Sequence, residues 1–391
     1  MNWNSGLPEA AHILRGLIDA ASPNPPGDCE AVSRVCVAAL ASEVPDVRVV
    51  RAPDGTPSVL ASLGHGDRTL LIHSHYDTQP AGDPAAWDSD PYRATLRDGA
   101  IYGRGAGDDK GSVAAQMAAL LRLAREGFDP PYRLLFAFVA DEESGGERGT
   151  RFLREAGELA ADAALIGEQT DNQVAVGERG IVWLRVEFTG RAAHGAIPEA
   201  GASALAPAAR LIDQLHRRLA PSLRERRPTP LLPASSLTVG RCLAGVDVST
   251  VPAQALVEID RRIVPGEEPE TCIAEIAAMV EEVLREAPGV TAQVTTSLRS
   301  PAFLTAGDHP LVQSLQEAVV AIAGARPLTG YRQASDARFF AADGIPIVIF
   351  GPSDPAVGHA SNEYVAIDEL RLATEVLVRF AQGGIGGIPS E

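Results

Sequence analysis

The chain has 391 residues, of which 45% are hydrophobic and 22% are charged, so it is long enough for about two globular domains and is not typical of disorder. Its net charge of −17 argues against nucleic acid or an anionic membrane as a partner, because either would require a basic surface. Four cysteines without a Cys-x-x-Cys pair indicate neither a disulfide framework nor a thiolate zinc site.

No apolar run of about 18 residues is present that could span a bilayer. Residues 1–6 also lack the basic and then apolar order of a secretion signal. We therefore expect a cytoplasmic protein.

The first part of the chain predicts helices followed by buried strands. Helix is expected over residues 8–42, with an interruption at residues 22–27, where prolines forbid its continuation. Short apolar runs then predict strands, with a helix over residues 112–125 among them. These runs are residues 58–62, 69–73, 134–140 and 163–166. Buried strands that alternate with helices predict an α/β sandwich.

Residues 180–293 follow a different pattern, in which apolar and polar residues alternate as in half-buried strands. The strands expected there are residues 182–188 and 255–263, and the helices are near 204–217 and 268–286. The first pattern then resumes with a helix at 310–323, a strand at 345–350 and a helix at 369–382. We therefore predict one domain, residues 1–179 and 294–391, interrupted by a smaller α+β domain at 180–293.

The first polar motif, His75-Tyr76-Asp77, follows an apolar strand. Ligands of α/β folds bind at the carboxyl ends of strands. His75 and Asp77 are two residues apart and share one face of an extended chain, so the carboxylate can fix the tautomer of the imidazole or orient a neighbouring ligand. Polar residues that merely end a strand are the alternative.

The second motif is a glycine-rich loop, residues 103–111, that leads into the helix expected at residues 112–125. Such loops often bind phosphate. Here the Walker and dinucleotide spacings are absent, and the adjacent carboxylates of Asp108 and Asp109 would repel a phosphate. A loop that presents Asp108 to a cation fits better, and a helix N-terminus capped by acidic residues is the alternative.

Other apolar strands also end near acidic residues or a histidine. Three adjacent carboxylates, residues 141–143, are unfavourable after a buried strand unless a cation gathers them, although a solvated acidic loop is the alternative. Together the motifs supply two histidines and three carboxylates: His75, Asp108, Glu143, Glu168 and His359. Oxygen and nitrogen ligands without sulfur suit a Lewis-acidic metal pair that supports hydrolysis.

These motifs resemble those of the co-catalytic metallopeptidases and amidohydrolases, which include acetylornithine deacetylase, succinyl-diaminopimelate desuccinylase, aminoacylase-1 and glutamate carboxypeptidase. The resemblance implies a catalytic α/β/α sandwich of zinc-peptidase type, interrupted by an α+β lid through which a homodimer forms. It also implies two divalent metal ions, zinc first, with cobalt or manganese as alternatives. Asp108 would bridge both ions, His75 and Glu168 would complete one site, and Glu143 and His359 would complete the other.

The same resemblance implies roles around the metals. Glu142 would activate the water that bridges the ions, and Asp77 would support the ligands. His194, in the motif Gly190-Arg191-Ala192-Ala193-His194-Gly195, would stabilise the oxyanion in the active site of the partner subunit, and a structural histidine is the alternative.

Arg262 matches a family position that commonly binds the substrate carboxylate, and Arg338, in a further segment that matches the family, is a second anion-binding candidate. Either arginine could pair with a surface acid instead. Ser249 stands where the family usually has an asparagine that contacts substrate, and Gln169 stands where a proline often follows the metal-binding glutamate. These departures leave the substrate contacts open.

The expected function is hydrolysis of the amide bond in an N-acyl amino acid, because family members with glutamate at the position of Glu168 tend to be deacylases or carboxypeptidases. A carboxypeptidase or dipeptidase acting on short peptides is the alternative, since residues 87–92 and 108–111 resemble dipeptidase motifs. A non-catalytic binding protein and a phosphate-binding enzyme are the alternatives from other classes.

Overall fold

The computed structural model describes Trp3 and residues 6–384 and divides into two compact units. Unit 1 comprises Met1–Gly177, Thr305–Tyr331 and Ser335–Glu391, and unit 2 comprises Glu178–Leu304 and Arg332–Ala334. The rest of the chain, including four of the six residues considered for a secretion signal, lies outside the described residues. Within the described part, no helix is both long and apolar enough to cross a membrane.

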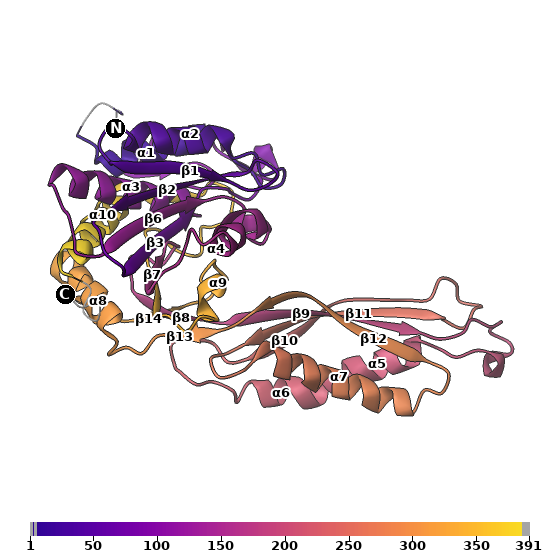
Figure 1. Cartoon of the computed structure of the whole chain (residues 1–391). Helices are drawn as coiled ribbons and strands as arrows, with labels where there is room; N and C mark the ends of the chain where they lie inside the picture. The colour runs from indigo at the N-terminus through magenta and orange to yellow at the C-terminus, as the bar shows by residue number, and fades with distance from the viewer. Residues whose placement is uncertain (1–2, 4–5, 385–391) are drawn as a thin grey trace. The chain divides into compact units, whose positions relative to one another are not determined.

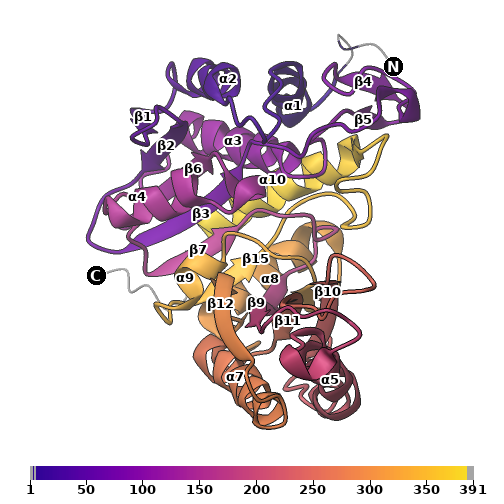
Figure 2. The same cartoon turned by 90° about the vertical axis from the view of Figure 1, so that its right-hand side faces the viewer.

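The long helices of unit 1 lie where the sequence predicts them. α1 (Glu9–Asp19) and α2 (Glu30–Leu40) flank the proline-rich segment, and α3 (Lys110–Arg125) begins two residues before the predicted start. α8 (Pro310–Ala323) and α10 (Ile367–Gln382) follow in the last part of the chain. α1, α3, α10 and α8 pack side by side in this order (Figure 2). Two short helices, α4 (Phe152–Glu155) and α9 (Arg338–Ala341), were not predicted.

A mixed sheet forms the centre of unit 1 (Figure 1). Its strands run in the order β1-β2-β6-β3-β7-β15-β8, and β14 pairs with β8. Their bounds are β1 (Asp46–Arg51), β2 (Pro57–Leu63), β3 (Thr69–His75), β6 (Arg133–Val139), β7 (Ala163–Ile166), β8 (Ala175–Glu178), β14 (Thr329–Tyr331) and β15 (Ile347–Ile349). A small second sheet has the order β16-β5-β4, with β4 (Thr95–Arg97), β5 (Ala100–Tyr102) and β16 (Tyr364–Ala366). The predicted α/β class is confirmed.

Four neighbouring strands, β6, β3, β7 and β15, are parallel to one another. His75 is in register with Val139, and Ile166 is in register with both His73 and Ile349, so the carboxyl ends of these strands lie at one edge of the sheet. Strands buried on both faces are continuous apolar runs in sequence, which is why these four were predictable.

Unit 2 contains a four-stranded antiparallel sheet in the order β10-β11-β9-β12. Its strands are β9 (Gly180–Thr189), β10 (Ser236–Ala244), β11 (Gln254–Ile263) and β12 (Thr291–Ser300), followed by the short β13 (Phe303–Leu304). α5 (Leu205–Gln214), α6 (Ala220–Leu223) and α7 (Pro269–Arg285) belong to the same unit. Alternate residues of β9 and β11, such as Val186 and Val257, pack against Leu211 of α5 and Ile276 of α7.

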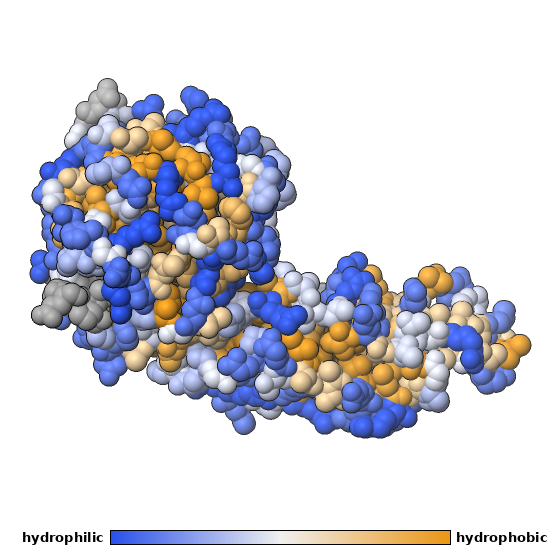
Figure 3. Space-filling view, in the orientation of Figure 1, coloured by the Kyte–Doolittle hydropathy of each residue, from blue (hydrophilic) through white to orange (hydrophobic). Residues whose placement is uncertain are grey.

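The edge strands β10 and β12 were not predicted from the sequence. Most residues of β10 are exposed, and β12 alternates between exposed and half-buried residues, so neither strand carries a strong apolar signal. Figure 3 shows hydrophilic and hydrophobic residues interspersed over the visible face of both units.

Gly149 lies in the turn between β6 and α4 and has an unusual backbone conformation, with φ −104° and ψ −106°. A Cβ atom at this position would lie 1.8 Å from the carbonyl oxygen of Ala140, which is backbone and cannot move aside. We expect Gly149→Ala to lower the free energy of unfolding by about 1–3 kcal/mol. Chemical denaturation would measure this loss. Gly240→Ala is the control, because an added Cβ meets no atom within 4 Å there, and equal stability of the two variants would contradict the prediction.

Candidate metal centre

The carboxyl edge of the parallel strands gathers the predicted ligands of unit 1. His75 is the last residue of β3, Glu143 follows β6, Glu168 follows β7, and His359 lies in the loop after β15. Asp108 comes from the glycine-rich loop between β5 and α3. Each ligand therefore comes from a different segment, and the order of strands in the sheet brings the segments together.

The five side chains form two groups that share Asp108. The ligand atoms of His75, Asp108 and Glu168 lie within 4.8 Å of one another, as do those of Asp108, Glu143 and His359. Asp108 Oδ1 lies 3.3 Å from His75 Nε2, and Asp108 Oδ2 lies 3.1 Å from His359 Nε2. His359 Nε2 is also 3.2 Å from Glu143 Oε2. One oxygen of Asp108 thus faces each histidine, which is the arrangement of a bridging carboxylate.

The donor set fits two divalent ions. His75 Nε2 is buried and has no hydrogen-bond partner among the described residues, as expected for an atom that binds a metal. Burial disfavours the charged imidazole of His75, but the carboxylates of Asp108 and Asp77 outweigh burial and raise its pKa well above the usual value. Hydrogen bonds to Asp108 and Glu143 raise the pKa of His359 to about 10. Without metal the carboxylates therefore hold protons on both histidines, and bound cations would displace those protons.

Glu142 lies beside the two groups but is not a member of either. Burial raises the pKa of its carboxyl well above the usual range, although Arg338 opposes this shift. Arg338 Nη2 lies 3.3 Å from Glu142 Oε1 and 3.0 Å from Asp336 Oδ1. A largely buried carboxyl with a raised pKa next to a candidate metal site is suited to accept and release a proton.

Asp77 is fully buried and holds the turn that carries Glu142 and Glu143. Its Oδ1 accepts a hydrogen bond from the backbone N–H of Glu142, and its Oδ2 accepts one from that of Glu143, both at 3.2 Å. Asn24 Nδ2 donates to the same carboxylate at 2.9 Å. Asp77 Oδ1 also lies 3.5 Å from His75 Nδ1. Asp77 therefore connects the turn bearing Glu142 with the first histidine.

Two further residues, Gln79 and Tyr331, donate hydrogen bonds to predicted ligands, and these roles were not predicted from the sequence. Gln79 donates from its backbone N–H and from Nε2 to the carboxylate of Glu143, both at 3.0 Å. The Tyr331 hydroxyl donates to Glu168 Oε2 at 2.8 Å. Gln79 follows the first motif closely enough to have been a candidate, whereas no sequence pattern points to Tyr331.

His73 shares a strand face with His75 but belongs to neither metal group. Its Nε2 lies 2.7 Å from Thr150 Oγ1, and its ring packs edge-on against Phe340. Burial lowers its pKa to about 4, so it is neutral near pH 7. His73 is therefore a core histidine.

Three predicted residues lie in unit 2. His194 and Ser249 are on adjoining loops, because the N–H of Gly195 donates to the Ser249 carbonyl at 2.6 Å. Arg262 lies on β11 and pairs with Asp260, with Nε 2.9 Å from Oδ1. Their roles toward substrate stay predictions.

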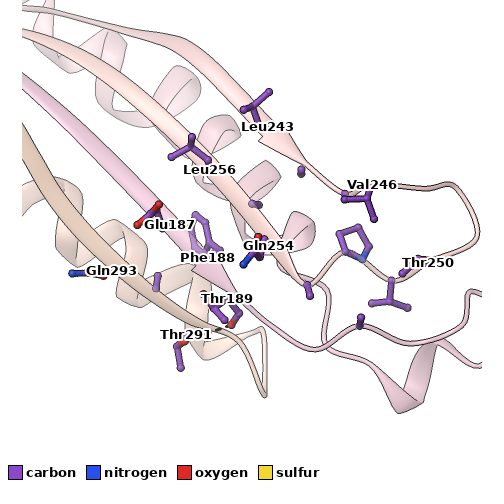
Figure 4. A pocket seen from close by; sticks show the side chains of 18 of the residues that line it. Glu187, Phe188, Thr189, Leu243, Val246, Thr250, Gln254, Leu256, Thr291 and Gln293 are labelled. Carbon is purple, nitrogen blue, oxygen red and sulfur yellow. Dashed lines mark hydrogen bonds between the residues drawn. The ribbon is translucent and has the colours of Figure 1, made fainter.

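Unit 2 also contains a groove of about 690 Å³ at one end of its sheet (Figure 4). Side chains from all four strands or their flanking loops line it, among them Glu187, Leu243, Val246, Gln254, Leu256 and Gln293. None of the eleven residues predicted for catalysis, metal binding or substrate binding is part of this lining. The lining does include Thr250, which follows Ser249 and pairs with His194 in an isolated β-bridge.

Comparison with known proteins agrees with the geometry of the metal groups. Residues 71–383 match the sequence profile of Peptidase family M20/M25/M40. The chain is 31% identical over 331 residues, 84% of each protein, to acetylornithine deacetylase of Myxococcus xanthus. It is 29% identical over 343 residues, 85% of each protein, to succinyl-diaminopimelate desuccinylase of Maricaulis maris. An M20 family metallo-carboxypeptidase from Sulfolobus solfataricus shares the fold, with a TM-score of 0.74 at 19% identity over 96% of this chain and 98% of that one.

Proposed function

Since the chain belongs to Peptidase family M20/M25/M40, we propose that it hydrolyses the amide bond of an N-acyl amino acid. The observation that carries this proposal is the carboxylate of Asp108, which presents one oxygen to each of the two histidines. Glu142, a largely buried carboxyl, lies beside the two groups and belongs to neither. A protein that only binds metal or ligand would not need a carboxyl that stays outside both ligand groups. A phosphate-binding enzyme is disfavoured because three carboxylates line the centre.

His75, Asp108, Glu143, Glu168 and His359 would hold two divalent ions, which we propose are zinc. Bound there, the ions would act as Lewis acids toward the amide carbonyl and lower the pKa of bound water. The chain supplies the proton transfer: the Glu142 carboxylate accepts a proton from the attacking water and then donates it to the leaving nitrogen. Arg338, itself paired with Asp336, holds the Glu142 side chain in place for both steps.

We assign residues 180–293 the role of a lid. In this proposal His194 donates a hydrogen bond to the oxyanion that develops on the amide carbonyl, and Arg262 pairs with the substrate carboxylate. Ser249, on the loop that adjoins that of His194, is proposed as a further substrate contact. Arg338 is the second candidate for the carboxylate, although its ion pairs with Asp336 and Glu142 favour a role in holding the base. The proposal includes a homodimer formed through this lid and a cytoplasmic location.

The acyl amino acid is preferred as substrate because two relatives aligned over more than four fifths of the chain carry the names of a deacetylase and a desuccinylase. Glu168 disfavours a dipeptidase, since family members with glutamate at this position tend to be deacylases or carboxypeptidases. Peptide hydrolysis is the second candidate, favoured by the shared fold with a metallo-carboxypeptidase.

A substrate panel tests the choice between these candidates. The purified protein, loaded with zinc, manganese or cobalt, would be assayed on N-acetyl and N-succinyl amino acids and on dipeptides. We expect kcat/KM to be at least about tenfold higher for the best N-acyl amino acid, which corresponds to about 1.4 kcal/mol of preferential transition-state binding. Faster cleavage of dipeptides would favour the peptidase, and no cleavage of either class with any metal would contradict the proposed function.

A further inference from the structure

A buried carboxylate, Glu363, lies beneath the loop that carries Asp108. Glu363 is fully buried, and its Oε1 accepts hydrogen bonds from the backbone N–H groups of Gly107 and Asp108, both at 2.8 Å. Its Oε2 accepts a third from the N–H of Gly105 at 3.1 Å. One side chain therefore binds three N–H groups of this loop, including that of Asp108.

Arg104 extends this network to the second loop. Its Nη1 donates to Glu363 Oε2 at 2.8 Å, and its Nη2 donates to the carbonyl oxygen of His359 at 3.3 Å. The guanidinium is buried and stacks over the Trp87 ring, 5.0 Å from its centroid. Because a guanidinium is planar and has several N–H groups, it can bind the carboxylate and the carbonyl at the same time.

The segments on either side are fixed by the small sheet. β5 precedes the Asp108 loop and β16 begins directly after Glu363, and the two strands pair with Tyr364 opposite Tyr102. The backbone N–H of Gly103 also donates to the carbonyl oxygen of Glu363 at 3.0 Å. Glu363 and Arg104 thus lie at the ends of two paired strands and connect two loops that are about 250 residues apart in the chain.

His359 needs such support more than the other ligands do. Its side chain is 55% exposed, whereas those of Asp108 and Glu143 are 14% and 5% exposed. Its backbone φ is +61°, in the left-handed region that histidine seldom adopts. Burial alone therefore does not hold this ligand in place.

We propose that Glu363, together with Arg104, is a positioning residue that holds the Asp108 and His359 loops in register, so that the group formed by Asp108, Glu143 and His359 is preorganised to bind its ion. This inference rests on the proposed two-metal function and deepens it. Neither residue contacts substrate in this proposal. Both act through the ligands, as partners beyond the ligand shell do in other metal sites.

Glu363→Gln tests the network with almost no change in side-chain volume. In the wild type both oxygens of Glu363 accept hydrogen bonds from backbone or guanidinium N–H groups. Whichever way the glutamine amide is oriented, its NH₂ group replaces one of these oxygens, so a donor then faces donors. Metal affinity would be measured by competition with a chelator of known affinity. We expect the ion held by Asp108, Glu143 and His359 to bind about 10–100-fold less tightly than in wild type, with a much smaller change for the other ion. Raising the metal concentration should restore turnover.

Arg104→Lys is the second variant and keeps the positive charge beside Glu363. A lysine cannot bridge the carboxylate and the His359 carbonyl as a planar guanidinium does, so we expect the same selective loss for the ion of the His359 group. This variant carries the test if Glu363→Gln fails to fold.

Glu267→Gln in unit 2 is the matched control. Glu267 also accepts hydrogen bonds from an arginine, Arg261 at 2.7 Å, and from a backbone N–H, that of Val264 at 3.0 Å, but it contacts no predicted metal ligand. We expect this variant to lose thermal stability and to keep both metal affinities.

Wild-type affinity for both ions in Glu363→Gln and Arg104→Lys, with only a loss of stability as in the control, would overturn the inference. A wild-type protein that binds no second ion would contradict the two-metal function and remove the basis of the inference. The two failures are distinguishable because the first appears only in the variants and the second appears in the wild type.

Discussion

Glu142→Gln is expected to lower kcat by about 100- to 10,000-fold, the usual contribution of a general acid–base residue. The amide cannot accept a proton from the attacking water or deliver one to the leaving nitrogen, but it has nearly the same shape as the carboxyl. Glu142 belongs to neither metal group, so metal content should stay at the wild-type value. KM should change little, because substrate binding does not require the proton transfer.

Steady-state kinetics and metal analysis of the same sample would check this prediction. Glu147→Gln is the matched control, because Glu147 lies five residues away in an exposed ion pair with Arg151 and should be kinetically silent. Loss of metal together with activity in Glu142→Gln would instead make Glu142 a ligand. Unchanged turnover would place the base elsewhere.

Asp108→Ala is expected to remove both metal ions and to lower kcat/KM by more than about 1,000-fold, which corresponds to about 4 kcal/mol of transition-state stabilisation. The effect is larger than for any other single ligand because Asp108 is the only residue in both groups. His75 and His359 each lose their contact with an Asp108 oxygen at the same time.

Removal of metal from the wild-type protein with a chelator should produce the same loss of activity, and adding zinc back should restore activity only in the wild type. Asp213→Ala is the control, since Asp213 is an exposed surface residue paired with Arg217, and its loss should change stability by no more than about 0.5 kcal/mol. Full activity of the chelated wild type would contradict a metal-dependent reaction. Retention of one tightly bound ion by Asp108→Ala would show that the carboxylate is not shared.

The five predicted ligands could be picked out of the sequence because each lies in a short local pattern, and the structure brings them together in two groups. His75, Glu143 and Glu168 follow apolar runs that become buried parallel strands, and the carboxyl ends of neighbouring parallel strands lie at one edge of a sheet. The partners that hold these ligands were much harder to predict. Tyr331 lies 163 residues from Glu168, and no pattern around Tyr331 distinguishes it from an ordinary core tyrosine.

The sequence by itself determined the α/β class, the buried central strands and the set of residues that face one another at the metal centre, because hydrophobic periodicity and strand-end motifs are local. Only the tertiary structure decided the supporting contacts. It placed Asp77 under the turn of Glu142, paired Arg338 with Glu142, and set Glu363 beneath Asp108. These contacts join segments that are 65 to 255 residues apart in the chain. Whether such side chains meet depends on strand register and loop path, and neither is encoded in a local pattern.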